Sequence, residues 1–253
     1  MPRLQLPTVT LCAATSVNLA ATVDALRACS DRIEFAECLL LTDVALATSN
    51  PIRRVAIPRL ASAADYSDFL LRRLVDHVRT SHCLIVQWDG FVIDPKYWQD
   101  RFLDLDYIGA PWPQFHDGHD VGNGGFSLRS RRLMEACASP NFMPSHPEDV
   151  AICRSNRAML EDVHGIRFAD FSTAEAFAFE RTEPRGSFGF HGAFNLAEIV
   201  GADRFWEIYS KLDDRTTVFA DLALILRQLG HGKRATERRL RLLIDYLRAR
   251  CGF

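Results

Sequence analysis

The run Cys83-Leu84-Ile85-Val86-Gln87-Trp88-Asp89-Gly90 restricts the fold more than any other stretch of this chain. Leu84, Ile85 and Val86 present no polar side to solvent, as expected for a strand that is covered on both faces. Such strands belong to parallel sheets with helices on each side. Asp89 follows this strand, at the edge where open α/β sheets bind their ligands.

Strands and helices alternate through most of the sequence. The pattern predicts strands at Thr8–Thr15, Glu37–Asp43, Arg54–Ile57, Cys83–Asp89, Tyr107–Trp112, Phe126–Leu128 and Arg167–Ala169. It predicts helices at Asn18–Cys29, Ser67–Val78, Ser130–Ala138 and Glu148–Leu160, and a helical tail from Ala202. This order indicates an α/β fold with a mostly parallel central sheet flanked by helices, and a C-terminal helical extension.

The bulk properties predict one domain over residues 1–253, with a core at about 8–196 and the helical extension at about 202–253. A net charge of −2 gives no general drive toward nucleic acid. No apolar run reaches the ~18 residues that cross a bilayer, and the N-terminus lacks a signal-peptide core. We therefore expect a cytoplasmic protein. Seven cysteines without a CxxC pair predict reduced, mostly buried thiols.

Asp89 has two interpretations. Asp-Gly at the end of a strand is a common turn sequence. A carboxylate at this edge can also bind a divalent cation, which in turn binds a diphosphate. Hard cations prefer oxygen ligands, so Asp89 with phosphate oxygens and water would suit Mg²⁺ or Mn²⁺.

The segment Gly122-Asn123-Gly124-Gly125 is rich in glycine. It could be only a tight loop, or it could let the backbone approach a ligand closely. It has neither the spacing nor the position of a dinucleotide-binding loop. Arg129, a few residues later, is interpreted as a solvated charge at the entry to a helix.

Glu148 and Asp149 begin a predicted helix. Ser145 and Glu148 fit a capping box, with Pro147 in the first turn, which gives Glu148 a structural role. Asp149 has no such role. A helix N-terminus favours the ionised carboxylate, which can take a proton from an attacking hydroxyl group.

Four motifs together resemble a bacterial family assigned to the GT-A glycosyltransferase fold. They are Gln87-Trp88-Asp89-Gly90-Phe91-Val92, Tyr107-Ile108-Gly109-Ala110-Pro111-Trp112, Gly122 to Ser130, and Pro147-Glu148-Asp149. The resemblance covers roughly residues 8–196. Gln87-Trp88-Asp89 is similar to the Asp-x-Asp metal motif of such enzymes, with Gln87 in place of the first acid. The pair Glu148-Asp149 looks like the Glu-Asp motif of the more distant β-1,4-galactosyltransferase group.

This resemblance implies the roles of individual residues. Asp89 and His191 would bind the metal, Mn²⁺ or Mg²⁺. Asp149 would be the catalytic base, and Glu148 would assist it and bind the acceptor. The nucleotide would lie near Ala13, Thr15, Asp43, Gln87 and Asp89. Trp112, Asn123, Gly124 and Gly125 would join Glu148 in binding substrate. Trp112 has two interpretations of its own, since an aromatic side chain can belong to the core or stack on a sugar ring.

We therefore expect a glycosyltransferase, with an inverting mechanism, that moves a sugar from a nucleotide-diphosphate sugar to a carbohydrate or lipid-linked acceptor. The resemblance favours a UDP-sugar and a setting in bacterial polysaccharide biosynthesis. Two alternatives stay open. One is a related module that binds nucleotide sugars or glycans without catalysis, as Gln87 suggests. The other is a nucleotidyltransferase, although Ala13-Ala14-Thr15-Ser16 lacks its Gly- and Arg-rich signature.

The last helix carries apolar residues at helical spacing, namely Leu240, Leu243, Ile244, Leu247 and Cys251. The favoured interpretation packs this apolar face on the domain and leaves a solvated basic face. The alternative is that arginines such as Arg238, Arg239 and Arg241 contact anionic lipid at the inner face of the membrane.

Overall fold

The computed structural model describes residues 3–184, 186–230, 232 and 234–251. The chain forms two compact units, Met1–His191 and Gly192–Phe253, which are described separately below. The single domain expected from the sequence stays a prediction. None of the described helices is long and apolar enough to cross a membrane.

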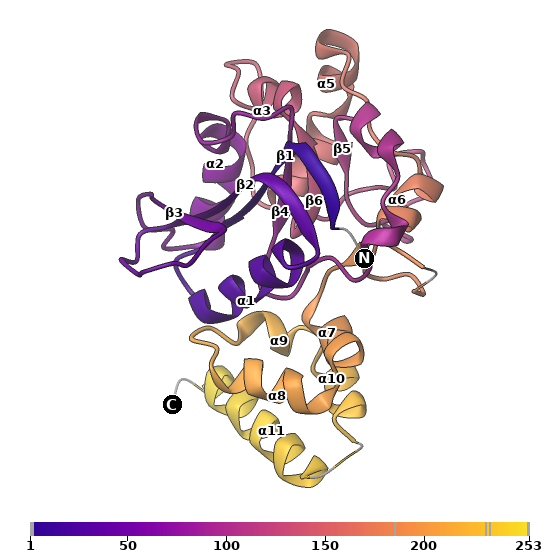
Figure 1. The fold of residues 1–253 in the computed structure, drawn as a ribbon. Helices are drawn as coiled ribbons and strands as arrows, with labels where there is room; N and C mark the ends of the chain where they lie inside the picture. The colour runs from indigo at the N-terminus through magenta and orange to yellow at the C-terminus, as the bar shows by residue number, and fades with distance from the viewer. Residues whose placement is uncertain (1–2, 185, 231, 233, 252–253) are drawn as a thin grey trace. The chain divides into compact units, whose positions relative to one another are not determined.

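The first unit is built on a sheet whose strands lie in the order β3-β2-β1-β4-β6-β5 (Figure 1). The strands are β1 (Leu4–Ala14), β2 (Ile33–Thr42), β3 (Ile52–Ala56), β4 (His82–Val86), β5 (Tyr107–Ile108) and β6 (Phe126–Ser130). The first four run parallel, and β6 runs antiparallel to its neighbours β4 and β5. The predicted α/β class and mostly parallel sheet are confirmed.

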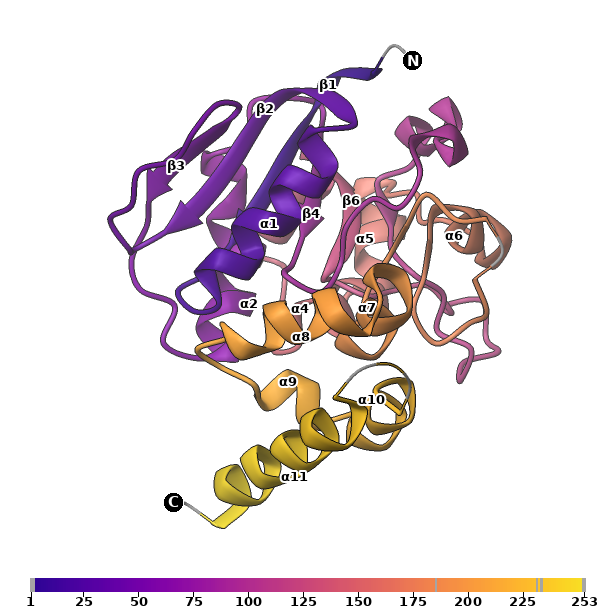
Figure 2. The same cartoon turned by 60° about the horizontal axis from the view of Figure 1, so that its bottom comes forward.

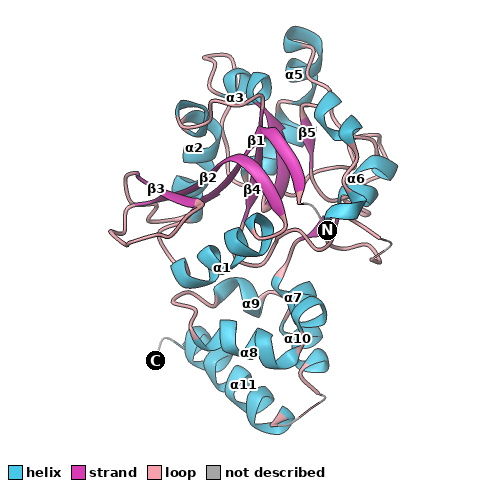
Figure 3. Cartoon of the chain, in the orientation of Figure 1, coloured by secondary structure: helices cyan, strands magenta, loops and turns pink. Residues whose placement is uncertain are grey.

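Helices cover both faces of this sheet (Figure 3). They are α1 (Leu19–Ser30), α2 (Ala63–Arg72), α3 (Arg131–Cys137), α4 (Glu148–Val150), α5 (Arg157–His164) and α6 (Phe171–Phe177). Alternate strand residues face opposite sides. Leu11 and Leu84 pack with Leu26 of α1, whereas Cys12 and Ile85 pack in a second cluster with α2. The buried strand of the sequence analysis is thus covered on both faces.

Two predicted helices begin or end differently. Ser67–Val78 is shifted, because Ser62 accepts a hydrogen bond from Asp65 N and starts α2 earlier; a 3₁₀ turn, Leu74–Asp76, follows it. Glu148–Leu160 is divided into α4, a π-helical turn (Ala151–Ser155) and α5. The Asn156 side chain donates to Ala151 O and Met143 O and so competes with regular helix formation.

Two further differences concern short elements. The predicted strand Arg167–Ala169 is reduced to a single bridge between Tyr107 and Phe168. A separate pair of parallel strands, β7 (Ala178–Phe179) and β8 (Gly189–Phe190), was not predicted. Its two-residue strands are too short to produce a recognisable alternation. Six of the seven cysteines are buried and Cys251 is exposed, as expected for reduced thiols.

The second unit consists of α7 (Ala193–Val200), α8 (Ala202–Ser210), α9 (Thr216–Phe219), α10 (Leu222–Gln228) and α11 (Ala235–Cys251). Figure 2 shows α11 as its longest helix, near the C-terminus. The favoured packing of α11 was wrong. Its buried side carries Arg238, Leu242 and Asp245, while Leu240, Leu243 and Leu247 are exposed. The inward charges are paired, Arg238 with Asp203 and Asp245 with Arg215 and Arg241.

Asp106 ties β5 and β6 to the start of α3. Its buried carboxylate accepts hydrogen bonds from Ser130 Oγ (2.6 Å), Arg167 N (2.8 Å) and the Arg132 guanidinium. Burial acts to raise the pKa of Asp106, but these donors outweigh it, so the pKa is lowered. Ser130 Oγ also caps α3 by accepting from Leu133 N. One carboxylate therefore joins three segments.

We predict that Asp106→Ala lowers the free energy of unfolding by about 2–3 kcal/mol, because it leaves buried donors without an acceptor. Urea denaturation at neutral pH measures the loss. The difference between the two proteins should shrink as the pH falls through the lowered pKa of Asp106, since protonation removes the same interaction from the wild type. Asp104→Ala, at an exposed neighbouring acid, should change stability by less than about 0.5 kcal/mol. An equal loss in both variants would contradict this role for Asp106.

Candidate functional site

The candidate site lies beyond the carboxyl ends of the parallel strands. Thr15 follows β1, Asp43 follows β2, and Asp89 comes three residues after β4. Because these strands are parallel neighbours, their carboxyl ends meet at one edge of the sheet. Asp89 is held there by a turn in which Gly90 N donates to Gln87 O (3.1 Å). The strand ends thus bring the predicted nucleotide and metal residues to one edge.

His191 lies beside Asp89. Its Nε2 is 3.5 Å from Asp89 Oδ1 and 3.2 Å from Gln87 Oε1. Its Nδ1 is 3.2 Å from Glu180 Oε1. Burial of the ring opposes the imidazolium, but the Asp89 and Glu180 carboxylates prevail and raise the pKa of His191 to about 9. At neutral pH the ring is a cation between two acids.

Glu180 was missed by the sequence analysis. It directly follows β7, and His191 directly follows β8, whose pairing with β7 places Phe179 opposite Phe190. The two side chains therefore leave adjacent strands at the same point. Burial favours the neutral acid, yet the bond and charge of His191 lower the pKa of Glu180. A carboxyl residue after the apolar run Phe177-Ala178-Phe179 was the available signal, although the run alone does not reveal its partner.

The glycine-rich segment packs against the site's own side chains. A Cβ atom on Gly125 would lie 2.0 Å from His191 Nε2, and one on Gly124 would lie 1.9 Å from Glu148 Oε1. Asn123 adopts a left-handed conformation (φ +66°), and its Oδ1 accepts from Gly125 N at 3.0 Å. Gly124 N donates to Asp149 Oδ2 at 3.2 Å. The segment thus joins the histidine cluster to the two acids of α4.

Glu148 has a different structural role from the one that the sequence suggested. The capping box with Ser145 is not formed, because Pro147 occupies the N-cap position and no side chain caps α4. Instead, Glu148 Oε1 lies 3.1 Å from Arg129 and Oε2 accepts from Ser67 Oγ at 3.3 Å. The interpretation of Arg129 as a solvated charge was also wrong. It is 1% exposed, because it neutralises the buried Glu148.

Asp149 is only partly buried, and its two carboxylate oxygens accept hydrogen bonds from Gly124 N and Val150 N. Burial and the charge of Glu148 raise its pKa, while the N–H groups of Val150 and Gly124 counteract the rise. A carboxylate with a raised pKa is a stronger base than an ordinary one. Of the two acids, Asp149 is therefore the one suited to accept a proton, since Glu148 is engaged by Arg129 and Ser67.

The remaining predicted site residues are at the ends of β1 and β2 and in a hydrophobic cluster. Ala13 is buried at the end of β1, and Thr15 N donates to Leu41 O. Asp43 Oδ1 is buried and has no hydrogen-bond partner among the described residues. Trp112 is 7% exposed and packs with Phe115 in a hydrophobic cluster, which favours a packing role over sugar stacking.

One feature of Asp89 and His191 suits a divalent cation, namely the carboxylate that the second ring nitrogen of His191 contacts. A metal-binding histidine usually donates its second ring nitrogen to a carboxylate, as His191 does to Glu180. A cation would have to displace the proton from Nε2. In the parts of the chain that the structure describes, no group of three or more His, Cys, Asp or Glu residues is arranged to bind a metal. Asp89 and His191 would need further ligands from a diphosphate or water.

Residues 51–191 match a family described as "Protein of unknown function (DUF5672)". The match spans more than half of the chain, which therefore belongs to this family. No curated protein matches the sequence. Among solved structures, the fold is similar to "Mannosyltransferase PcManGT from Pyrobaculum calidifontis in complex with GDP-Man and Mn2+", with 12% identity and a TM-score of 0.45. That comparison covers 98% of this chain and 84% of the other and assigns no activity here.

We predict that Arg129→Met destabilises the protein by about 3 kcal/mol or more, because Glu148 loses its buried counter-charge. Thermal or urea unfolding measures the change. In the double variant Arg129→Met/Glu148→Met most of the loss should be recovered, since no unpaired charge is left. Arg79→Met removes an exposed arginine of the same unit and serves as the control. If the double variant is as unstable as the sum of the single variants, the pair has no such coupling.

Proposed function

We propose that this chain is a glycosyltransferase that moves a sugar from a nucleotide-diphosphate sugar to a carbohydrate acceptor in the cytoplasm. The observation that supports it most is the convergence of Asp89, His191 and Asp149. The first two lie in contact, the charge of Asp149 also acts on His191, and Gly124 and Gly125 connect the three. The combination suits binding of a diphosphate beside a carboxylate base.

In the proposed reaction, Asp149 takes the proton of an acceptor hydroxyl as its oxygen attacks the anomeric carbon. The new carbon–oxygen bond forms on the face opposite the nucleoside diphosphate, and the bond to the diphosphate breaks, so the configuration is inverted. Mn²⁺ or Mg²⁺, bound by Asp89 and His191, would neutralise charge on the departing diphosphate. Glu180 orients His191, and the ion pair with Arg129 holds the Glu148 side chain in position for the acceptor.

The nucleoside is proposed to lie along the ends of β1 and β2. Asp43 supports this placement, because its buried Oδ1 has no hydrogen-bond partner among the described residues and a ribose hydroxyl would supply the missing donor. UDP is the favoured nucleotide, on the resemblance of the sequence motifs alone. A setting in bacterial polysaccharide synthesis rests on the same resemblance.

A second candidate is a module that binds nucleotide sugars without catalysis. Gln87 replaces the first acid of the metal motif, and its amide is already used, since Nε2 donates to Tyr66 Oη at 2.8 Å and Oε1 lies beside His191. Both candidates predict nucleotide binding. Only the enzyme releases nucleoside diphosphate from a donor, so slow donor hydrolysis separates them.

We predict that UDP with Mn²⁺ raises the melting temperature of the wild type, because ligands that bind the native state stabilise it. Asp89→Asn and His191→Ala should each abolish the additional rise in melting temperature that Mn²⁺ causes in the presence of UDP. Glu180→Gln should raise the Mn²⁺ concentration required by about 10–100-fold, as expected when the partner of a metal-binding histidine is lost. Asp31→Asn, at an exposed acid, is the control. Unchanged Mn²⁺ titrations in all three site variants would refute the metal site.

We predict that Asp149→Asn reduces turnover by about 10² or more while donor binding stays near that of the wild type, because the amide cannot accept a proton. The measurements are release of nucleoside diphosphate from a panel of sugar nucleotides and nucleotide titration by calorimetry. Asp162→Asn changes an exposed acid and should have no effect. If Glu148→Gln is the more damaging change in a folded protein, the base has been assigned to the wrong acid.

A further inference from the structure

The helix α11 presents its apolar side outward. Leu240 is 58% exposed, Leu243 38% and Leu247 56%, and the exposed Cys251 continues the row. Their spacing of three and four residues puts them on one side of the helix. The opposite side, with Arg238, Leu242 and Asp245, is buried in the second unit. We call the outward row Leu240, Leu243, Leu247 and Cys251 the apolar stripe.

Arginines border the apolar stripe on both sides. At 3.6 residues per turn, Arg239 and Arg250 fall on one flank, and Arg241 and Arg248 on the other. All four are exposed. Arg241 pairs with Asp245, whereas Arg239 and Arg248 form no ion pair with any residue that the structure describes. Glu237 is the only exposed acid on the helix. The stripe is therefore an apolar surface within a positive border.

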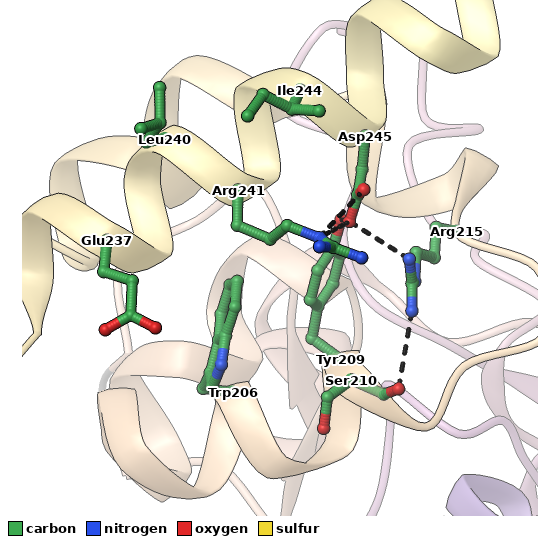
Figure 4. A pocket seen from close by; sticks show the side chains of 9 residues that line it. All are labelled: Trp206, Tyr209, Ser210, Arg215, Glu237, Leu240, Arg241, Ile244 and Asp245. Carbon is green, nitrogen blue, oxygen red and sulfur yellow. Dashed lines mark hydrogen bonds and ion pairs between the residues drawn. The ribbon is translucent and has the colours of Figure 1, made fainter. Parts of the chain in front are cut away.

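The apolar stripe continues into a hollow of about 430 Å³ between α8 and α11 (Figure 4). Leu240 and Ile244 form one wall, and Trp206 stands on the other side with its ring stacked on Tyr209. Arg215 and Arg241 line the hollow too, held by Asp245. Tryptophan is enriched at the boundary between water and lipid. The hollow extends the apolar area and places an aromatic ring at its edge.

The charge of the whole chain is unevenly distributed. Residues 192–253 contain eleven basic and eight acidic side chains and so carry a net charge of +3. Since the chain carries −2, residues 1–191 carry −5. The positive charge is thus concentrated in the unit that bears the apolar stripe. An anionic surface would attract this unit and repel the remainder of the chain.

We infer that α11 binds the surface of an anionic membrane, with the apolar stripe buried at the level of the lipid headgroups and the bordering arginines on the lipid phosphates. Helices that lie in a membrane interface have this arrangement of apolar and basic sides. A second copy of the chain fits less well, because pairing two stripes would bring the arginine borders together. The inference is independent of the proposed sugar transfer.

Co-sedimentation of the full chain with vesicles tests this. The wild type should bind vesicles of phosphatidylcholine mixed with phosphatidylglycerol at low salt, bind less at high salt, and leave vesicles of phosphatidylcholine alone unbound. Leu243→Ser/Leu247→Ser should lower the partition coefficient by about 30-fold or more, because two apolar side chains are lost from the contact. Arg239→Gln/Arg248→Gln should lower it by about 30-fold at low salt.

Matched controls distinguish binding through the apolar stripe of α11 from nonspecific adsorption to vesicles. Val163→Ser/Leu224→Ser removes two exposed apolar side chains elsewhere, and Arg72→Gln/Arg73→Gln removes two exposed charges from the first unit. Both should bind vesicles like the wild type. Because every altered side chain is exposed, melting temperatures should stay unchanged, and donor hydrolysis without vesicles should be unaffected by the α11 variants.

Three results would overturn the inference. The first is equal binding to neutral and anionic vesicles, or no binding to either. The second is wild-type binding by the folded Leu243→Ser/Leu247→Ser variant. The third is a stable dimer in sedimentation equilibrium that this variant converts to a monomer, which would make a second copy the occupant of the stripe.

Discussion

The buried ion pair between Arg129 and Glu148 is the interaction on which the candidate site depends. It connects β6, in the central sheet, to α4, which carries Asp149. Removing one partner of such a pair leaves an uncompensated charge in the interior, at a cost comparable to a large part of the stability of a domain. The pair holds Glu148 against Gly124, and Gly124 in turn donates to Asp149. The position of the second acid is therefore set by the pairing of the first.

The sequence predicted the sheet well, because each parallel strand must be apolar on both faces and each helix must bury one stripe. Those requirements act within a single segment. The carboxyl-terminal position of Asp89 follows from the same rule, and so does its proximity to the ends of β1 and β2. What a run of residues cannot show is which distant side chain neutralises a buried charge. Arg129 was taken for a surface residue for this reason.

The absence of information on distant contacts also explains why the sequence analysis missed Glu180 and predicted the wrong buried side of α11. Glu180 meets His191 through two strands of two residues each, which leave no periodic signal. On α11 the sequence predicted the apolar row correctly, but the prediction that this row is the buried side of the helix was wrong. Apolar periodicity identifies a stripe without saying which side of the helix the rest of the unit covers. Here the opposite side of α11 faces the rest of the unit, because Asp245 on that side bonds to Tyr209 and Arg215. Asp245 also pairs with Arg241 of the same helix.

The close approach of glycine to the His191 ring has a consequence for ligand binding. Cβ atoms on Gly90 or Gly125 would come within 3 Å of the imidazole, so backbone encloses the ring on these sides, while Glu180 fixes its Nδ1. The side chain has therefore already lost its rotational freedom before any ligand arrives. Ordering a mobile side chain on binding costs about 0.5–1.5 kcal/mol. In this protein the entropic cost of ordering His191 arises during folding and not on ligand binding, so the site is preorganised.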